Sequence, residues 1–201
     1  MHELLPGIFT WSWFSEKQGY DFNGTLVLGE DGNLCIDPVP PTNDVLDRLT
    51  EEGVATILIT NRNHSRATNQ VRERTGAQVL IHPADASHAR DNGTAIDADL
   101  QAGQRVGPFT VVGVPGKSPG EVALHDAGRG LLIVGDAVIG NPPGGCSLLP
   151  ERVIDDLPRL RASVRQLLTL DFDVLLVGDG VPVLEGARER LRELVAAFPS
   201  D

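Results

Sequence analysis

Residues 57–66 read ILITNRNHSR, an apolar run that ends abruptly in a polar burst. The apolar half is β-branched or leucine, which is typical of a buried strand. The polar half carries one histidine, two asparagines and two arginines. Loops at the ends of strands are where layered α/β proteins usually build their sites. The stretch therefore predicts a strand followed by a polar loop. This loop is a metal site, the remnant of one, or an ordinary connection.

Short apolar runs of the same kind recur along the chain and predict further strands. They lie at residues 8–13, 25–28, 34–36, 79–81, 109–114, 122–125, 131–134 and 174–177. Helical spacing predicts one helix capped by Thr42 or Asn43 and a second that is capped by Ser65, runs to Thr75 and stops at Gly76. It predicts two more over 160–168 and 187–198. Strands that alternate with helices favour a layered α/β fold, and no linker or repeat interrupts it, so we expect one domain over residues 1–201.

The composition describes a globular protein with a strong excess of acid. The chain has 201 residues, of which 41% are hydrophobic, and its net charge is -11. General nucleic-acid and anionic-membrane binders need clustered Lys and Arg, so both classes are excluded. Cys35 and Cys146 are the only cysteines, which makes neither a disulfide scaffold nor a Cys-rich zinc site. With no basic leader in residues 1–14 and no long apolar run, we expect a cytoplasmic protein with a small-molecule ligand and leave its oligomeric state open.

Four loops that follow predicted strands resemble, in order and spacing, the signatures of the metallo-β-lactamase superfamily. Residues 60–66, TNRNHSR, stand in place of T-H-x-H-x-D-H, and residues 115–120, PGKSPG, in place of P-G-H-T-P-G. Residues 130–140, GLLIVGDAVIG, are similar to G-L-L-F-T-G-D-A, and residues 178–180, GDG, to G-H-G. The segment CIDP around Asp37 also matches. The resemblance covers nearly the whole chain and implies a four-layer αββα sandwich.

The resemblance also implies a centre of two metal ions, yet most of its ligand positions carry other residues here. A different ligand is expected at Asn61, Asn63, Ser65, Arg66, Lys117 and Asp179, and only Asp136 is unchanged. Asparagine and serine are weak neutral ligands for zinc, and arginine cannot lose its proton in a protein. We therefore expect the standard dinuclear site to be lost and no cofactor to be needed.

Two interpretations of the altered loops make the protein non-catalytic or ligand-binding. In the first, Arg66 and Lys117 replace the metal charge by salt bridges to Asp136 and Asp179, because buried carboxylates need partners. Such a pocket suits a carboxylate or a phosphate. Its candidate anion-binding residues are Asn61, Asn63, Arg66 and Lys117. In the second, the side chains point to solvent and the site has decayed.

A third interpretation keeps one divalent metal. His64, Asp136 and Asp179 offer one nitrogen and two oxygen donors, enough for a single ion with open positions. His64 lies one place off the ligand register of the family, so the loop has to re-aim it. This interpretation predicts a mono-metal or metal-free hydrolase of a small ester or thioester, with the same three residues as catalytic candidates. Whether the protein is an enzyme stays open.

Three other features make weaker predictions. Residues 116–120, GKSPG, satisfy the G-x-S-x-G nucleophile motif, but that motif needs a following helix and EVALH predicts a strand, so Ser118 is not an expected nucleophile. Cys146 lies in a Gly/Pro-rich loop and would react only beside a cation. Trp11 and Trp13 share one strand parity, which favours packing of both into the core.

Overall fold

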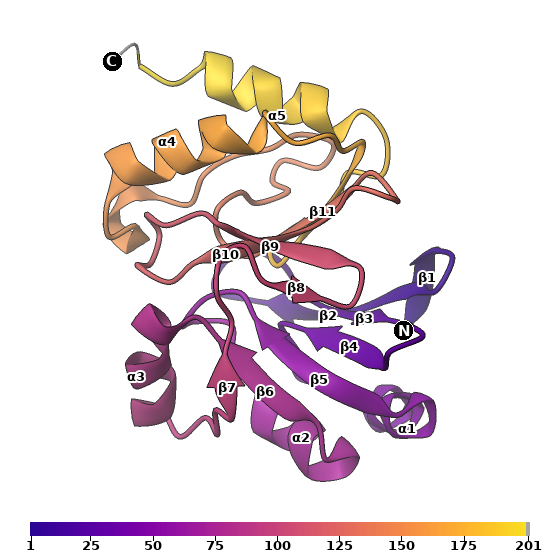
Figure 1. The fold of residues 1–201 in the computed structure, drawn as a ribbon. Coiled ribbons are helices and arrows are strands. Elements are labelled where there is room, and N and C mark those ends of the chain that lie inside the picture. The colour runs from indigo at the N-terminus through magenta and orange to yellow at the C-terminus, as the bar shows by residue number, and fades with distance from the viewer. Residues whose placement is uncertain (200–201) are drawn as a thin grey trace. The chain divides into compact units, whose positions relative to one another are not determined.

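The computed structural model describes residues 1–199 and divides the chain into two compact units, Met1–Gln101 and Ala102–Asp201 (Figure 1). Each unit contains one β-sheet and the helices that pack on it. The single domain expected over residues 1–201 stays a prediction.

The first unit is built on a seven-stranded sheet in the order β1-β2-β3-β4-β5-β6-β7. Its strands are β1 (His2–Leu5), β2 (Ile8–Ser15), β3 (Tyr20–Val27), β4 (Asn33–Ile36), β5 (Val54–Ile59), β6 (Gln78–Ile81) and β7 (Ala98–Asp99). Neighbours are antiparallel from β1 to β4 and parallel from β4 to β7. The change of direction at β4 brings the ends of β4 and β5 to one edge, where their following loops can meet.

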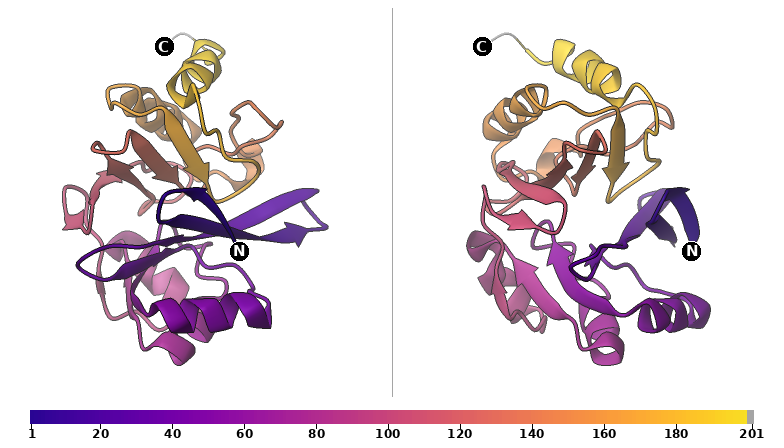
Figure 2. Two further views of the ribbon diagram at one scale, coloured as in Figure 1. Left: turned by 90° about the vertical axis from the view of Figure 1, so that its right-hand side faces the viewer. Right: turned by 45° about the vertical axis from the view of Figure 1, so that its right-hand side comes forward.

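Three helices cover one face of this sheet: α1 (Asn43–Glu52), α2 (Thr68–Thr75) and α3 (Pro83–Asp91) (Figure 2). Thr42 caps α1 by accepting the backbone N–H of Val45, as predicted. The expected cap of α2 at Ser65 is wrong: the helix begins at Thr68 and its N-cap is Ala67. Residues 62–67 form turns instead, because the side chain of Asn61 accepts the backbone N–H of Asn63.

The second unit has a five-stranded sheet in the order β12-β11-β10-β9-β8. Its strands are β8 (Arg105–Val106), β9 (Phe109–Gly113), β10 (Val122–Asp126), β11 (Leu131–Val134) and β12 (Val174–Val177). Only β11 and β12 pair in parallel. The helices α4 (Leu157–Leu167) and α5 (Ala187–Ala196) pack on one face, and a short 3-10 helix spans Glu151–Val153. Their apolar faces are the ones that helical spacing predicted.

The two tryptophans of β2 have different environments. Trp11 is buried, 4% exposed, and its indole N–H donates to the carbonyl of Val39, whereas Trp13 is 45% exposed. The prediction that both pack into the core is wrong for Trp13. The difference follows from strand pairing. β4 pairs only with residues 25–27 of β3, whereas Trp13 lies farther along the β2–β3 hairpin, beside Phe22.

Gly24 leaves space that the indole of Trp11 fills. A Cβ at Gly24 would lie 2.4 Å from Cζ2 of Trp11. Gly24→Ala is therefore expected to lower the free energy of unfolding by about 1–3 kcal/mol, the usual cost of overpacking a core. Urea denaturation measures it, with Gly145→Ala as control, where a Cβ meets nothing closer than 3.5 Å. Equal stability of the two variants would contradict the prediction.

No helix within residues 1–199 is both long and apolar enough to cross a membrane.

Candidate functional site

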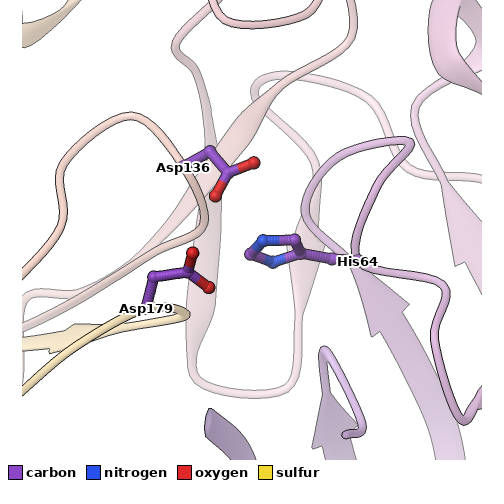
Figure 3. A group of neighbouring side chains, drawn as sticks. All are labelled: His64, Asp136 and Asp179. Carbon is purple, nitrogen blue, oxygen red and sulfur yellow. The ribbon is translucent and has the colours of Figure 1, made fainter. Parts of the chain in front are cut away.

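Two carboxylates meet at the end of the parallel strand pair in the second unit. Val134 of β11 pairs with Val177 of β12, and Asp136 and Asp179 each follow two residues later. Each is 4% exposed, and a carboxylate oxygen of one lies within 4.8 Å of an oxygen of the other (Figure 3). Two buried negative charges this close repel one another, so the site needs positive charge nearby.

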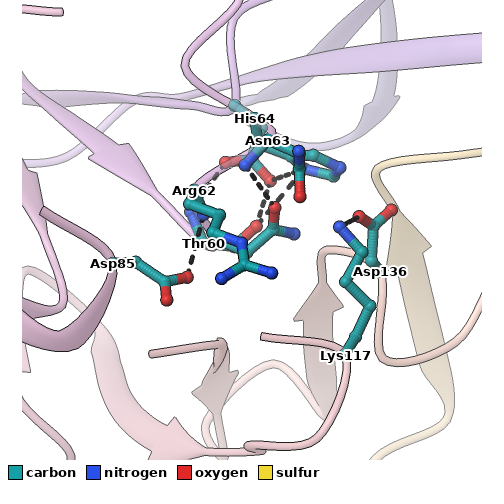
Figure 4. Close-up of polar contacts among 9 residues, drawn as sticks. Thr60, Arg62, Asn63, His64, Asp85, Lys117 and Asp136 are labelled. Carbon is teal, nitrogen blue, oxygen red and sulfur yellow. Dashed lines mark hydrogen bonds and ion pairs between the residues drawn. The ribbon is translucent and has the colours of Figure 1, made fainter. Parts of the chain in front are cut away.

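Lys117 supplies such a charge. It lies in the loop between β9 and β10, and its Nζ is 2.6 Å from Oδ2 of Asp136 (Figure 4). The two side chains are only 6% and 5% exposed. The predicted ion pair between Lys117 and one of the aspartates is therefore present. Lys117 stands at the position of the histidine in the P-G-H-T-P-G signature.

Asp37 organises the loop that follows β5 in the first unit. Its Oδ1 accepts the backbone N–H of Thr60 at 2.8 Å, and its Oδ2 accepts the Thr60 hydroxyl at 2.5 Å. Nδ1 of His64 lies 2.7 Å from the same Oδ2. Asp37 is 2% exposed, His64 is wholly buried, and Asp37 has a positive φ of 48°. Because a carboxylate accepts hydrogen bonds, Nδ1 of His64 carries the proton that it donates to Asp37.

In the sequence, Asp37 stands out only as part of the CIDP segment, and its role as acceptor for Thr60 and His64 was not predicted. The available signal was its position directly after β4, the parallel neighbour of β5. Because parallel strands end at the same edge of a sheet, a carboxylate at that position can reach the loop after the next strand.

The asparagines of the loop differ in environment. Asn61 is wholly buried, and its side-chain oxygen accepts the backbone N–H of Asn63 at 2.8 Å. Asn63 is exposed. The backbone N–H of Arg62 donates to Oδ2 of the buried Asp85 at 2.9 Å (Figure 4). Side-chain hydrogen bonds from two directions therefore fix the backbone of this loop.

Arg66 lies over an aromatic ring of its own unit. Its guanidinium carbon is 4.1 Å from the centre of the Phe22 ring, within the range of a cation–π contact. Arg66 is half-buried and belongs to the first unit, whereas Asp136 and Asp179 belong to the second. The predicted salt bridge from Arg66 to these aspartates stays a prediction.

Neither alternative nucleophile is supported by its surroundings. Burial raises the pKa of Cys146 to about 11, although Arg190 acts in the opposite direction, so the thiol stays protonated near neutral pH. Ser118 is buried in a loop that leads into β10, a strand. The helix that a nucleophile elbow requires is therefore replaced by a strand, as the sequence predicted.

Comparison with known proteins identifies the class to which this fold and these loops belong. A sequence model described as the metallo-beta-lactamase superfamily matches residues 1–198. The chain belongs to this superfamily, which confirms the predicted family and fold.

Curated relatives of the chain carry the name of a hydrolase. A hydroxyacylglutathione hydrolase of Cereibacter sphaeroides is 31% identical over 154 residues, which cover 72% of this chain and 56% of the relative. A protein of the same name from Fuscovulum blasticum is 28% identical over 179 residues, covering 85% and 64%. The chain thus spans less than two thirds of the length of these relatives.

Solved structures agree on the fold. A metallo-beta-lactamase from Pontibacter korlensis aligns with a TM-score of 0.77 at 14% identity, covering 98% of each chain. The protein TTHA1623, solved in a di-iron-bound form, aligns with a TM-score of 0.68 at 26% identity, covering 90% of this chain and 98% of its own. A metallo-β-lactamase fold is therefore shared by proteins of low sequence identity.

Proposed function

We propose that this chain is a superfamily member that has lost the standard dinuclear metal centre and binds a small anion without catalysing metal-dependent hydrolysis. The observation that carries the proposal is the buried ion pair between Lys117 and Asp136, with 2.6 Å between Nζ and Oδ2. A divalent ion bound to this oxygen would meet an ammonium group at very short range. Repulsion between two cations in a buried site is strong, so the lysine competes directly with metal.

The donor set of the first unit supports the same conclusion. Two imidazoles of the family signature are replaced by Asn61, whose side-chain oxygen is used to fold the loop, and by Asn63, which is exposed. Arg66 carries a permanent positive charge and donates hydrogen bonds only. These residues do not fit a pair of metal ions, but they do fit an anion.

One observation favours a mono-metal hydrolase as a second candidate. His64, Asp136 and Asp179 are all buried and each offers one ligand atom. The hydrogen bond from His64 Nδ1 to Asp37 is of the kind that orients a metal-binding imidazole through its other nitrogen. A divalent ion bound by these residues would supply a Lewis acid and an activated water. The names of the relatives direct this candidate to small thioesters.

Metal content separates the two candidates. Protein produced with zinc, manganese and iron available and then dialysed is expected to carry far less than one equivalent of metal by plasma mass spectrometry. Lys117→Ala is expected to raise the metal content, because it removes the cation beside Asp136. Lys17→Ala is the matched control, since Lys17 is exposed and its loss changes the net charge equally.

A stoichiometric metal that disappears in His64→Ala and Asp136→Ala would contradict the proposal and favour the mono-metal hydrolase. Hydrolysis of a small thioester by wild type and by the same two variants would then be measured. An identical metal content in Lys117→Ala and Lys17→Ala would show that Lys117 does not compete with metal.

The proposal includes the cellular location of the protein and the kinds of partner that it binds. The net charge of -11 supports the absence of nucleic-acid binding. A cytoplasmic location and a small-molecule ligand remain predictions.

A further inference from the structure

A polar pocket of about 410 Å³ lies in the first unit, beside the loop that follows β5. The loop, the beginning of α2 and the end of α3 form its walls. Its lining includes Arg62, Asn63, Arg66, Asn69, His88 and Asn92. No carboxylate is among the lining residues that the structure describes between positions 1 and 199. The pocket therefore concentrates positive charge and hydrogen-bond donors.

This local charge opposes the charge of the whole chain. Two guanidinium groups line one small pocket in a protein whose net charge is -11. Two positive groups beside one pocket both attract an anion that enters it. A guanidinium is a planar fork that binds carboxylate and phosphate oxygens in pairs. We propose that this pocket binds the phosphate group of a small molecule, an inference that rests on the proposed anion-binding function and names its ligand class.

Hydrogen bonds hold two walls of the pocket. The side chain of Asn69 donates to the carbonyl of Gly93 at 2.8 Å and accepts the backbone N–H of Ala95 at 3.1 Å. The side chain of Asn92 donates to the carbonyl of His88 at 2.9 Å. The Asn69 contacts tie α2 to the segment that follows α3, and the Asn92 contact closes the last turn of α3. Both are present before any ligand binds, which lowers the entropic cost of binding.

Each arginine is also supported. Asp85 is wholly buried and accepts the backbone N–H of Arg62 at 2.9 Å, which fixes the backbone of the loop (Figure 4). Asp85 itself does not line the pocket. The ring of Phe22 lies under the guanidinium of Arg66 at 4.1 Å. A stacked guanidinium loses less conformational freedom when it binds an anion, because its plane is already restricted.

Phosphate matches the pocket better than a single carboxylate. A phosphate monoester carries a charge of about -1.5 to -2 near neutral pH and has three acceptor oxygens, so it can engage Arg62 and Arg66 together. A monocarboxylate has one charge and satisfies one fork. The pocket volume of about 410 Å³ falls in the range of small-molecule sites and leaves room for an organic group beside the phosphate.

Calorimetric titration with inorganic phosphate at fixed ionic strength tests the assignment, with malonate as a dicarboxylate comparison. Saturable phosphate binding is expected, and Arg62→Gln and Arg66→Gln are each expected to weaken it by about tenfold or more, since each removes a charge-assisted contact. Arg74→Gln is the matched control: it lies on α2, is exposed, pairs with Asp47 and carries the same charge change. If Arg66→Gln fails to fold, Arg66→Lys keeps the charge and removes the fork.

Lack of saturable phosphate binding by folded wild type would overturn the inference, as would equal weakening in Arg74→Gln. Tighter binding of malonate than of phosphate would overturn the assignment to phosphate. The titrations are made on protein before and after chelator treatment, and the metal content of both samples is measured. If the untreated protein contains metal and phosphate binding still needs Arg62 and Arg66, only the proposed function is contradicted. If the protein is metal-free and does not bind phosphate, only this inference is contradicted.

Discussion

Replacing Lys117 with methionine is expected to lower the free energy of unfolding by about 3–5 kcal/mol, because the change leaves the carboxylate of Asp136 buried without its ammonium partner. The expectation depends on burial: the Asp136 side chain is only 5% exposed, so water cannot replace the lost charge. An exposed ion pair would contribute little. Urea denaturation at neutral pH measures the difference.

Two further variants make the test specific. Lys17→Met removes an exposed lysine and is expected to change stability little. The double variant Lys117→Met/Asp136→Asn is expected to be more stable than Lys117→Met alone, since it no longer buries an uncompensated charge. If Lys117→Met and Lys17→Met cost the same, the ion pair would not stabilise the fold, and a metal at Asp136 would face little competition from Lys117.

The fold was predictable because its strands and helices carry strong local patterns. The β-branched runs coincide with β2, β4, β5 and β6 and with most of the second sheet. The strands that the sequence did not reveal are β1, β7 and β8, which are two to four residues long and too short to show a period. The exposure of Trp13 depends on which strands pair beside it, which no local pattern records.

The candidate site was predictable only as far as motif positions determine it. The match to family signatures placed Lys117 and Asp136 in one predicted pocket, and they are ion-paired. The contact of Arg66 with Phe22 was not predictable in this way, because Phe22 lies 44 positions earlier in the chain. Contacts between distant segments depend on sheet order, and sheet order is a tertiary property.

Asp37→Ala is expected to destabilise the protein by about 3–5 kcal/mol, because three buried donors lose their acceptor: the backbone N–H and hydroxyl of Thr60 and Nδ1 of His64. Each buried donor left unsatisfied costs about 1–3 kcal/mol, although the hydroxyl can rotate toward another acceptor. Alanine also tolerates the positive φ of 48° at this position less well than aspartate does.

Asp37→Asn is expected to cost less than Asp37→Ala, because asparagine keeps one acceptor oxygen and accepts a positive φ. Its amide nitrogen, however, turns one side of the group into a donor facing other donors, so wild-type stability is not restored. Asp21→Ala serves as the charge-matched control, since Asp21 is an exposed residue of β3. Urea denaturation of the three variants should rank Asp37→Ala as least stable. A ranking in which Asp37→Ala equals Asp21→Ala would show that the loop holds its shape without Asp37, and the orientation of His64 would then need another cause.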